Sequence, residues 1–342
     1  MELDVNRVRP IAAGDLDALL DLARGAGTGF TSLPPVREVL ERKIARSLAS
    51  FGEDVKRPGP ERYMFVLEDM TSRTMLGCCA IEAACGLEEP FYSYHVGLTV
   101  QASPALDVYK RLPTLYLSND LTGASMLCSL YLNRDARQGG NGAMLSKSRF
   151  LFMAAFPQRF ADKVIAEMRG VSDENGRSPF WEGLGRHFFD IEYGAAEHVV
   201  GQGNKAVIAE LMPKHPIYTV LLPAEAQAVL GQVHPETAPA LRFLEQERFR
   251  YQGYIDIFDG GPSVEAPLRA IRSVRRSLLL PAIIEDGRLS DTRPLLIANE
   301  QLADYRCTMA EARSGRDGVQ VSPAVAAALQ ISDGETVRVC PL

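Results

Sequence analysis

The stretch LCSLYLNRDARQGGNGAMLSKSRFLFMAA, residues 127–155, has the pattern of a strand, a glycine loop and a helix. Residues 127–132 are a short apolar run of strand length, and a helical pattern continues from Met144 to Pro157. Residues 137–142, between them, contain three glycines. A loop of this composition at a helix start presents backbone N–H groups without partners, and the helix dipole adds positive partial charge. The stretch therefore predicts an anion cradle.

The residues around the glycines indicate which anion the cradle binds. A P-loop would need Lys and then Ser or Thr after the last glycine, but Ala143 and Met144 stand there. The Gly-x-Gly-x-x-Gly order of a dinucleotide fold does not fit either. The pattern is Arg-x-x-Gly-x-Gly, formed by Arg137, Gly140 and Gly142. It resembles the pyrophosphate loop of the GNAT acyltransferase superfamily, which holds the diphosphate of an acyl-coenzyme A; the alternative is an ordinary glycine-rich turn.

The elements expected around this stretch follow the order of a GNAT domain. Strands are expected over 8–10, 63–68, 75–81 and 163–168, and helices over 15–23 and 179–189. Another strand is expected directly after residue 189. The resemblance to a GNAT domain therefore covers about residues 5–195 and predicts an α+β, GNAT-like acyltransferase fold.

Two segments of similar pattern extend this prediction. PFWEGLGRHFF at 179–189 and PALRFLEQERF at 239–249 share a proline, a leucine and a phenylalanine at the same offsets, and strand-like residues follow each. Two copies of one helix–strand unit predict a second, degenerate GNAT-like half. The alternative is coincidence between two amphipathic helices.

Three regions are expected from this organisation. A GNAT-like acyl-CoA-binding domain would span 1–195, a second half completing the active site 196–276, and a small β-rich C-terminal region 277–342. In the last region, strands are expected over 278–284, 294–298, 319–321 and 336–339.

Composition and charge argue against several classes of protein. The chain has 342 residues, enough for two domains or one large fused domain. Its net charge of −6 argues against a nucleic-acid or anionic-membrane partner. No apolar run approaches the roughly 18 residues of a membrane span, and no signal segment is recognised. The six cysteines lack Cys-x-x-Cys spacing, so we expect reduced core residues in a cytoplasmic protein.

Longer phrases spread over about residues 30–265 resemble one family. They are TSLP at 31–34, FVLED at 65–69, EPFYSYHVG at 89–97, PTLYLSNDLTG at 113–123, EMRGVSDENGRSPFWEGLGRHFF at 167–189, AELMPKHPIY at 209–218, GQVHP at 231–235 and YIDIFDGGP at 254–262. The family is the arginine N-succinyltransferases of bacterial arginine catabolism, including one subunit of a heteromeric arginine/ornithine form.

The resemblance implies an activity and partners. The expected reaction moves succinyl from succinyl-CoA to the α-amino group of L-arginine, giving N2-succinyl-L-arginine and CoA by direct transfer. Ornithine or another amine as acceptor remains open, as does a non-catalytic CoA-binding subunit of a heteromer. The expected assembly is a homo-oligomer, or a hetero-oligomer with a paralogous subunit.

Acyl transfer needs a group that moves protons, and His234 is the candidate. An imidazole titrates near neutral pH, and the resemblance implies the proton donor at this position. A histidine in a His-Pro turn is otherwise more often a surface residue, and the sequence leaves open whether His234 acts as base or acid. Leu130 matches the family's succinyl-CoA position, where its backbone would contact the donor while its side chain packs in the core.

The acyl donor is expected to meet the glycine loop through main-chain groups. The N–H groups that would bind the diphosphate belong to Gln138, Gly139, Gly140, Asn141, Gly142 and Ala143. Arg137 would add charge. Lys147 and Arg149 are further cations that would either add to it or be solvated helix residues.

The acceptor needs carboxylates for its guanidinium and a cation for its carboxylate. Candidates are Asn119 and Asp120, in an insertion over 88–122, and Glu167 and Arg169, at the end of the strand over 163–168. The alternative for each is a turn or cap role. No His-x-x-x-His or similar spacing occurs, so we expect no metal, and no cofactor bound permanently beside the co-substrate succinyl-CoA.

Overall fold

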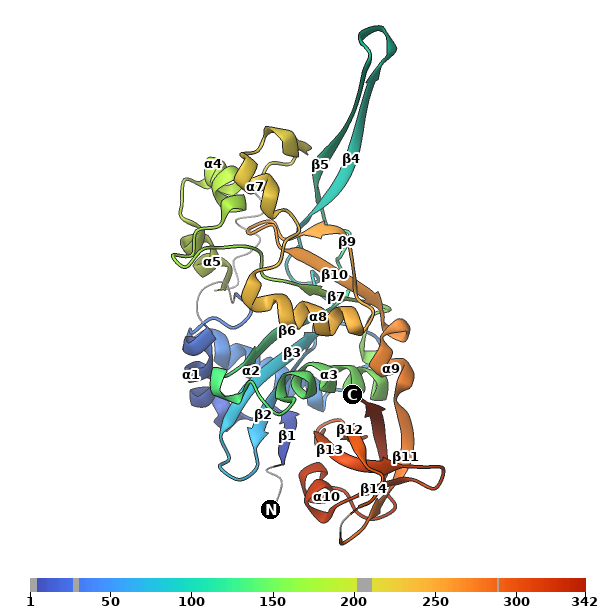
Figure 1. Cartoon of the computed structure of the whole chain (residues 1–342). Helices are drawn as coiled ribbons and strands as arrows, with labels where there is room; N and C mark the ends of the chain where they lie inside the picture. Colours follow the sequence, from blue (N-terminus) through green and yellow to red (C-terminus); the bar gives the residue numbers. More distant parts are fainter. Residues whose placement is uncertain (1–4, 27–30, 202–210, 288) are drawn as a thin grey trace.

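The computed structural model describes residues 5–26, 31–201, 211–287 and 289–342 of the chain (Figure 1). Its N-terminal part consists of a strand, two helices and two strands. These are β1 (Asn6–Pro10), α1 (Leu16–Ala26), α2 (Arg37–Gly52), β2 (Arg62–Asp69) and β3 (Met75–Glu82). β1 pairs antiparallel with β2, and β2 with β3. Helices α1 and α2 cover one face of these strands, where Leu40, Met64 and Cys78 share a core.

Residues 125–155 form the predicted strand, loop and helix. They are β6 (Ser125–Leu132) and α3 (Asn141–Ala155), and β7 (Lys163–Glu167) follows. Helix α3 covers the face of the sheet opposite α1 and α2, since Phe65, Leu127 and Phe152 pack together there. The expected α+β order of a GNAT-like domain is therefore confirmed up to β7.

β6 and β7 are parallel neighbours that pair over a short length. Ser125 and Met126 lie opposite Val164 and Ile165, and no further pairing between the two strands occurs in the described sheet. Beyond these residues the strands separate, and a gap opens between them.

A bulge in β6 lies at this gap. On β3, Cys78 pairs with Tyr131 and Ala80 with Cys128, so β6 contains one residue more than β3 over this span. Ser129, within the bulge, has a φ of 51°. A bulge of this kind bends its strand and leaves a residue outside the ladder.

Further strands extend the sheet beyond β7. They are β10 (Pro262–Pro267), β9 (Arg250–Ile255), β4 (Ser93–Ser103), β5 (Val108–Ser118) and β8 (Ile217–Tyr218), in that spatial order. β10 pairs antiparallel with β7, which joins the segment after residue 196 to the first sheet. β4 and β5, from the insertion expected over 88–122, form a long hairpin that extends away from the body of the molecule (Figure 1).

Short helical segments lie between β7 and the C-terminal region. They are a π-helical turn (Trp181–Gly185), α4 (Arg186–Phe189), α5 (Tyr193–Gly201), α7 (Ala224–Val229), α8 (Ala238–Gln246) and α9 (Arg272–Arg276). The helix and strand expected from residue 239 onward are confirmed as α8 and β9. None of the described helices is long and apolar enough to cross a lipid bilayer.

The strand expected after residue 189 is wrong, because this segment continues into helix α5. Helix formation buries Tyr193 and Ala196 in one core with Trp181. The rings of Trp181 and Tyr193 have centroids 6.3 Å apart. The two similar sequence segments therefore differ in the element that follows the helix, and a second GNAT-like half stays a prediction.

The C-terminal residues form a β-rich unit with its own core. Its elements are β11 (Leu278–Ile284), β12 (Arg293–Asn299), β13 (Cys307–Ser314), β14 (Val319–Val321), α10 (Pro323–Leu329) and β15 (Thr336–Pro341). Leu295, Val319 and Leu329 are among its buried residues. The four expected strands are present, and β13 is additional.

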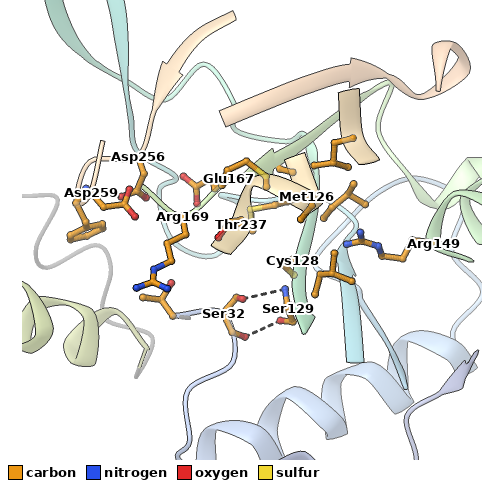
Figure 2. A pocket seen from close by; sticks show the side chains of 18 of the residues that line it. Ser32, Met126, Cys128, Ser129, Arg149, Glu167, Arg169, Thr237, Asp256 and Asp259 are labelled. Carbon is orange, nitrogen blue, oxygen red and sulfur yellow. Dashed lines mark hydrogen bonds between the residues drawn. The ribbon is translucent and has the colours of Figure 1, made fainter. Parts of the chain in front are cut away.

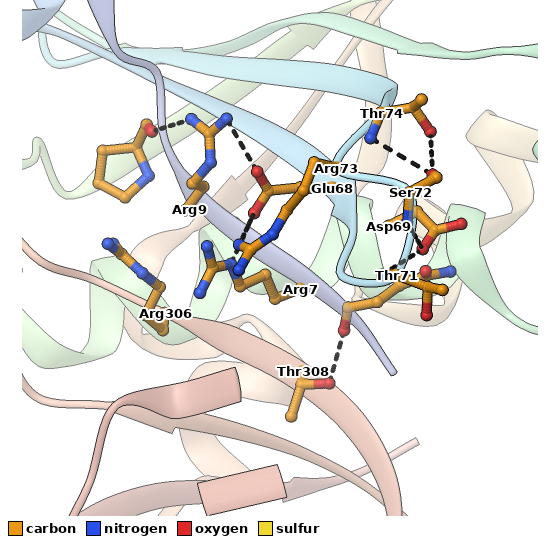
Figure 3. Close-up of polar contacts among 12 residues, drawn as sticks. Arg7, Arg9, Glu68, Asp69, Thr71, Ser72, Arg73, Thr74, Arg306 and Thr308 are labelled. Atoms are coloured by element: carbon orange, nitrogen blue, oxygen red, sulfur yellow. Dashed lines mark hydrogen bonds and ion pairs between the residues drawn. The ribbon is translucent and has the colours of Figure 1, made fainter. Parts of the chain in front are cut away.

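β1 joins this unit to the rest of the sheet, because it pairs with β2 on one side and β13 on the other. The Thr308 hydroxyl of β13 donates to the carbonyl of Asn6 at 2.7 Å. Next to this pair, Glu68 accepts hydrogen bonds from Arg7 at 2.7 Å and Arg9 at 3.3 Å (Figure 3). The N-terminal strand is thus fixed by ion pairs as well as by two ladders.

A buried carboxylate after α8 generates a prediction about stability. Glu247 is 1% exposed, accepts hydrogen bonds from the N–H and hydroxyl of Ser273 at 2.6 and 2.8 Å, and lies 3.5 Å from the Lys147 ammonium. Glu247→Ala should lower the free energy of unfolding by about 3 kcal/mol, because it leaves a buried ammonium and a buried N–H without partners. Urea denaturation measures this. The matched control is the exposed Glu245→Ala, expected within about 0.5 kcal/mol of wild type; equal values for the two variants would contradict the role of the buried pair.

Candidate active site

The gap between β6 and β7 contains a cavity of about 190 Å³. Residues 126–130 of β6 and residues 166–169 at the end of β7 line it, together with Thr237, Ala240 and Leu244 at and before α8. The remaining lining residues are Thr31, Ser32, Arg149, Tyr193, Asp256, Phe258 and Asp259. The cavity therefore lies where the first sheet meets the segment from 237 to 259.

The bulge that borders the cavity is held by polar contacts. The Ser129 hydroxyl donates to the Ser32 carbonyl at 2.9 Å, and the Ser129 N–H donates to the Ser32 hydroxyl at 3.2 Å (Figure 2). Arg62 Nη2 donates to the Ser129 hydroxyl at 3.0 Å. In the described sheet, neither Ser129 nor Leu130 is paired with a residue of β3. Leu130 packs against the main core and also lines the cavity, and its predicted backbone contact with the donor stays a prediction.

The predicted glycine loop lies at the start of α3. Two of its six predicted anion-binding N–H groups are already bonded, since Gln138 donates to the Ala136 carbonyl at 2.8 Å and Asn141 to the Gln138 carbonyl at 3.2 Å. Gly139 and Gly140 have φ values of 61° and 81°, which glycine adopts without strain. The Asn141 side chain donates to the Ala136 carbonyl at 3.0 Å and accepts from Asn6 at 3.0 Å, which fixes the loop. Within the described residues, no acceptor is found for four N–H groups, those of Gly139, Gly140, Gly142 and Ala143. The loop can therefore bind an anion through its main chain.

The three cations near this loop have different surroundings. Arg137 is exposed beside the loop, and its Nε donates to the Leu132 carbonyl at 3.2 Å. Lys147 is buried against Glu247, and Arg149 is 2% exposed and lines the cavity. The alternative that Lys147 and Arg149 are solvated helix residues is therefore wrong, since α3 is covered at these positions.

His234 lies at the edge of the cavity beside Arg169. The backbone N–H of His234 donates to the Arg169 carbonyl at 2.8 Å. The ring Nδ1 accepts a hydrogen bond from the Glu236 N–H at 3.2 Å. The ring is half-buried and is not part of the cavity lining. Thr237, three residues further along the chain, does line the cavity. Burial and the Arg169 guanidinium lower the pKa of His234, while the Glu236 carboxylate opposes them. A neutral imidazole that accepts at Nδ1 has its proton on Nε2.

Charged groups of both signs gather at the β7 side of the cavity. Glu167 and Arg169 lie there near Asp256 and Asp259 (Figure 2). Burial and the neighbouring Asp256 carboxylate raise the pKa of Asp259. This side of the cavity can therefore meet a substrate that has a cation and an anion.

Asn119 and Asp120 lie in the turn between β5 and β6, outside the described lining of the cavity. The Asn119 amide donates to the Phe91 carbonyl at 2.7 Å. Asp120 accepts from the Tyr254 hydroxyl at 3.0 Å. Both side chains connect the base of the hairpin to its neighbours, and their predicted contact with the acceptor stays a prediction.

A second cavity, of about 570 Å³, adjoins the first on the α2 side of the sheet. The two cavities share five lining residues, which are Thr31, Ser32, Met126, Cys128 and Glu167. Lys43 lines the second cavity, and its ammonium donates to the Ser32 carbonyl at 2.7 Å. Burial and the Arg62 guanidinium lower the pKa of Lys43 to about 7. Arg62 is itself paired with Glu82.

The structure brings Leu130, Glu167 and Arg169 to one cavity and places His234 at its edge. Polar residues of the two cavities that were not predicted as site residues include Lys43, Arg62, Ser129, Asp256 and Asp259. They come from separate segments, and no motif spacing connects them. The pairing of β7 with β10 and the bulge in β6 bring them together.

Two parallel strands that separate, a bulge on the first and an anion cradle on the helix after it define the class: the protein is a GNAT-like acyltransferase. The family model described as arginine N-succinyltransferase beta subunit matches residues 6–273, and the model of its C-terminal domain matches residues 279–341. The chain belongs to the arginine N-succinyltransferase family.

Individual relatives are similar over nearly the whole chain. The arginine N-succinyltransferase subunit beta of Pseudomonas aeruginosa is 50% identical over 336 residues, 98% of each chain. The arginine N-succinyltransferase of Enterobacter sp. (strain 638) is 48% identical over 337 residues, again 98% of each. The solved structure of arginine/ornithine succinyltransferase subunit AI from Pseudomonas aeruginosa is 40% identical, covers 99% of both chains and has a TM-score of 0.91.

The charges around His234 generate a prediction about its titration. Arg169→Met should raise the pKa of His234, because it removes a nearby positive charge, whereas Glu236→Gln should lower it by removing the opposing carboxylate. NMR titration of the imidazole, assigned with His234→Gln, measures both. Shifts in the same direction, or no shift in either variant, would contradict this electrostatic environment.

Proposed function

We propose that this chain transfers succinyl from succinyl-CoA to the α-amino group of L-arginine, giving N2-succinyl-L-arginine and CoA in arginine catabolism. The observation that carries the proposal is that the glycine loop at the start of α3 and a cavity in the β6–β7 gap occur together. The chain also belongs to the arginine N-succinyltransferase family. Direct transfer needs both substrates side by side, and proximity supplies much of the rate. The six cysteines are thiols, which supports a reducing compartment such as the cytoplasm.

The acyl donor would occupy the α3 side of the gap. Its diphosphate would lie on the N–H groups of Gly139, Gly140, Gly142 and Ala143, with Arg137 beside them. Its pantetheine arm would follow β6, and the backbone N–H of Leu130 would face the thioester oxygen. A donor at that point would stabilise the oxyanion that forms when the amine attacks.

The acceptor would approach from the β7 side of the gap. Carboxylates such as Glu167 would meet its guanidinium, and Arg169 would meet its carboxylate. Thr237, Ala240 and Leu244 line the same cavity, which supports the proposal that residues 196–276 complete the active site.

His234 would supply acid–base chemistry at this side. Its lowered pKa favours the neutral ring at pH 7. With its proton on Nε2, this ring would take the proton that the α-ammonium must lose before attack at Nδ1, in exchange for the hydrogen bond from the Glu236 N–H. The same ring, once protonated, could protonate the departing CoA thiolate. Either step requires the ring to reach the substrates from the edge of the cavity.

The test is release of CoA thiol by the purified chain alone. Succinyl-CoA and acetyl-CoA are each offered with arginine, ornithine or lysine. Rapid release with succinyl-CoA and arginine is expected. Release with ornithine would support the alternative acceptor, which the description of the 40% identical structure as arginine/ornithine succinyltransferase favours. CoA binding without any release would contradict the proposal and support a non-catalytic subunit.

We also propose that the chain is oligomeric and that the β4–β5 hairpin contacts a second copy. Leu106 and Tyr109, near the hairpin tip, are 74% and 70% exposed, and Leu98 and Val100 are each 48% exposed. Apolar exposure on a projecting arm is typical of a protein interface. Light scattering of the purified chain should give more than one chain mass, and Leu106→Ser with Tyr109→Ser should lower it. A monomeric wild type would contradict this proposal.

The cradle generates a prediction about CoA affinity. Gly142→Asp should weaken CoA binding tenfold or more, about 1.4 kcal/mol, because it puts a negative charge beside the diphosphate. Gly142→Ala is the matched control, since an added Cβ would meet only ordinary contacts at 3.9 Å with Leu132 and Phe243. Gly140 suits this test less, because its φ of 81° adds backbone strain. Calorimetric affinities that are equal for the two Gly142 variants would refute the loop assignment.

The role of His234 generates a prediction about turnover. His234→Ala should lower kcat by roughly 100-fold or more while CoA affinity is kept, because it removes the proton-transfer group. The exposed His187→Ala is the control and should keep wild-type turnover. Full activity of the His234 variant would assign the proton transfer to another residue.

A further inference from the structure

One buried cation of the cavity wall has no acidic partner among the described residues. Arg149 is 2% exposed, and its Nε and Nη2 donate to the carbonyl and hydroxyl of Ser146, both at 3.1 Å. Burial raises the pKa of the neighbouring Cys79 and Cys128 thiols, so neither provides a counter-charge at neutral pH. Burying a charge without a counter-charge is costly, and a guanidinium stays protonated in proteins.

Two other buried arginines are compensated by carboxylates, whereas the buried Arg159 donates to two backbone carbonyls and the Tyr63 hydroxyl and lines neither cavity. Arg7 donates to Glu68 at 2.7 Å, and Arg62 is paired with Glu82. Arg149 instead has two bonds to Ser146, which orient the guanidinium and leave its remaining edge for the cavity that it lines. A carboxylate entering the cavity would supply the missing counter-charge, and the guanidinium fork matches it in geometry.

The position of Arg149 separates it from the proposed acceptor side. It lies eight residues after Asn141, about 12 Å further along α3 from the cradle. Its side chain points toward β6 from the side opposite Glu167, Arg169 and Asp256 (Figure 2). A donor with its diphosphate on the loop and its thioester at Leu130 would thus have its acyl group between these two charged regions.

We infer that Arg149 binds the terminal carboxylate of the succinyl group and selects a dicarboxylic acyl-CoA over monocarboxylic ones. The inference rests on the proposed function. The carboxylate is the one group by which a succinyl chain differs from a butyryl chain of the same length. Its binding to α3 would turn the thioester carbonyl toward the bulge and keep the acyl carboxylate away from the acceptor's charges.

The other cations of the two cavities are less suitable. Arg169 already contacts the Ser172 hydroxyl at 3.0 Å and lies 3.8 Å from Glu236, and it stands on the acceptor side. Lys43 lines only the second cavity of the two and has a pKa near 7, so it is a weaker anion partner at neutral pH. Lys43→Met therefore serves as the comparison variant.

The experiment compares Arg149→Met, Arg149→Lys and Lys43→Met with wild type. For each, kcat/KM is measured with succinyl-CoA and with butyryl-CoA, and the affinity for free CoA is measured as a check on the cradle. Arg149→Met should lower the succinyl-to-butyryl ratio by roughly 100-fold, through succinyl-CoA alone, with CoA affinity unchanged. Arg149→Lys should recover part of the ratio, because it restores charge without the fork. Lys43→Met should leave the ratio near wild type.

Several outcomes would overturn the inference. An equal loss with both donors would assign Arg149 a structural role, and a loss of the ratio in Lys43→Met instead would assign the carboxylate to the second cavity. If Arg149→Met does not fold, an unchanged ratio in Arg149→Lys overturns the inference. If wild type transfers no acyl group, the proposed function fails, and equilibrium binding of succinyl-CoA and butyryl-CoA tests Arg149 separately: an equal preference in wild type and Arg149→Lys would overturn it.

Discussion

The separation of β6 from β7 is the constraint on which the candidate site depends. In a continuous sheet the ladder hydrogen bonds occupy the backbone, and no substrate can enter between neighbouring strands. Here the pairing stops after Met126, and the bulge at Ser129 bends β6. The bonds of Ser129 with Ser32 and Arg62 stabilise that strained position. Polar contacts therefore stabilise an irregularity in the sheet, and the cavity forms at this irregularity.

Helix α3 contributes to the candidate site in two ways, through the N–H groups at its start and through the buried cations further along it. Among the described residues, no acceptor is found for several N–H groups at its start, and the Asn141 side chain holds the loop that leads into the helix. Further along, Lys147 is neutralised by Glu247, which itself caps the start of α9. Arg149 lacks such a partner among the described residues and faces the cavity instead. Two cations two residues apart on one helix thus have different roles, because different segments cover them.

Much of the central fold could be predicted because its signals are local. The apolar run of β6, the glycines after it and the periodicity of α3 lie in one continuous stretch, and β2, β3 and β7 have clear strand patterns. Helix α2 was not predicted, since residues 37–52 mix polar and apolar residues without a strong cap. The segment after Phe189 was assigned to the wrong element, because contact with Trp181 decides its conformation.

The glycine loop, the order of the central elements and the likeness to one family could all be predicted, because each depends on residues adjacent in the chain. Which charged groups lie close together depends instead on how the strands and helices pack. Glu167 and Arg169 reach Asp256 and Asp259 through the pairing of β7 with β10, and Lys43 reaches Ser32 across the packing of α2 on the sheet. Whether a buried cation has an acidic partner also depends on segments that are distant in sequence. Residue spacing along the chain therefore does not predict these pairs.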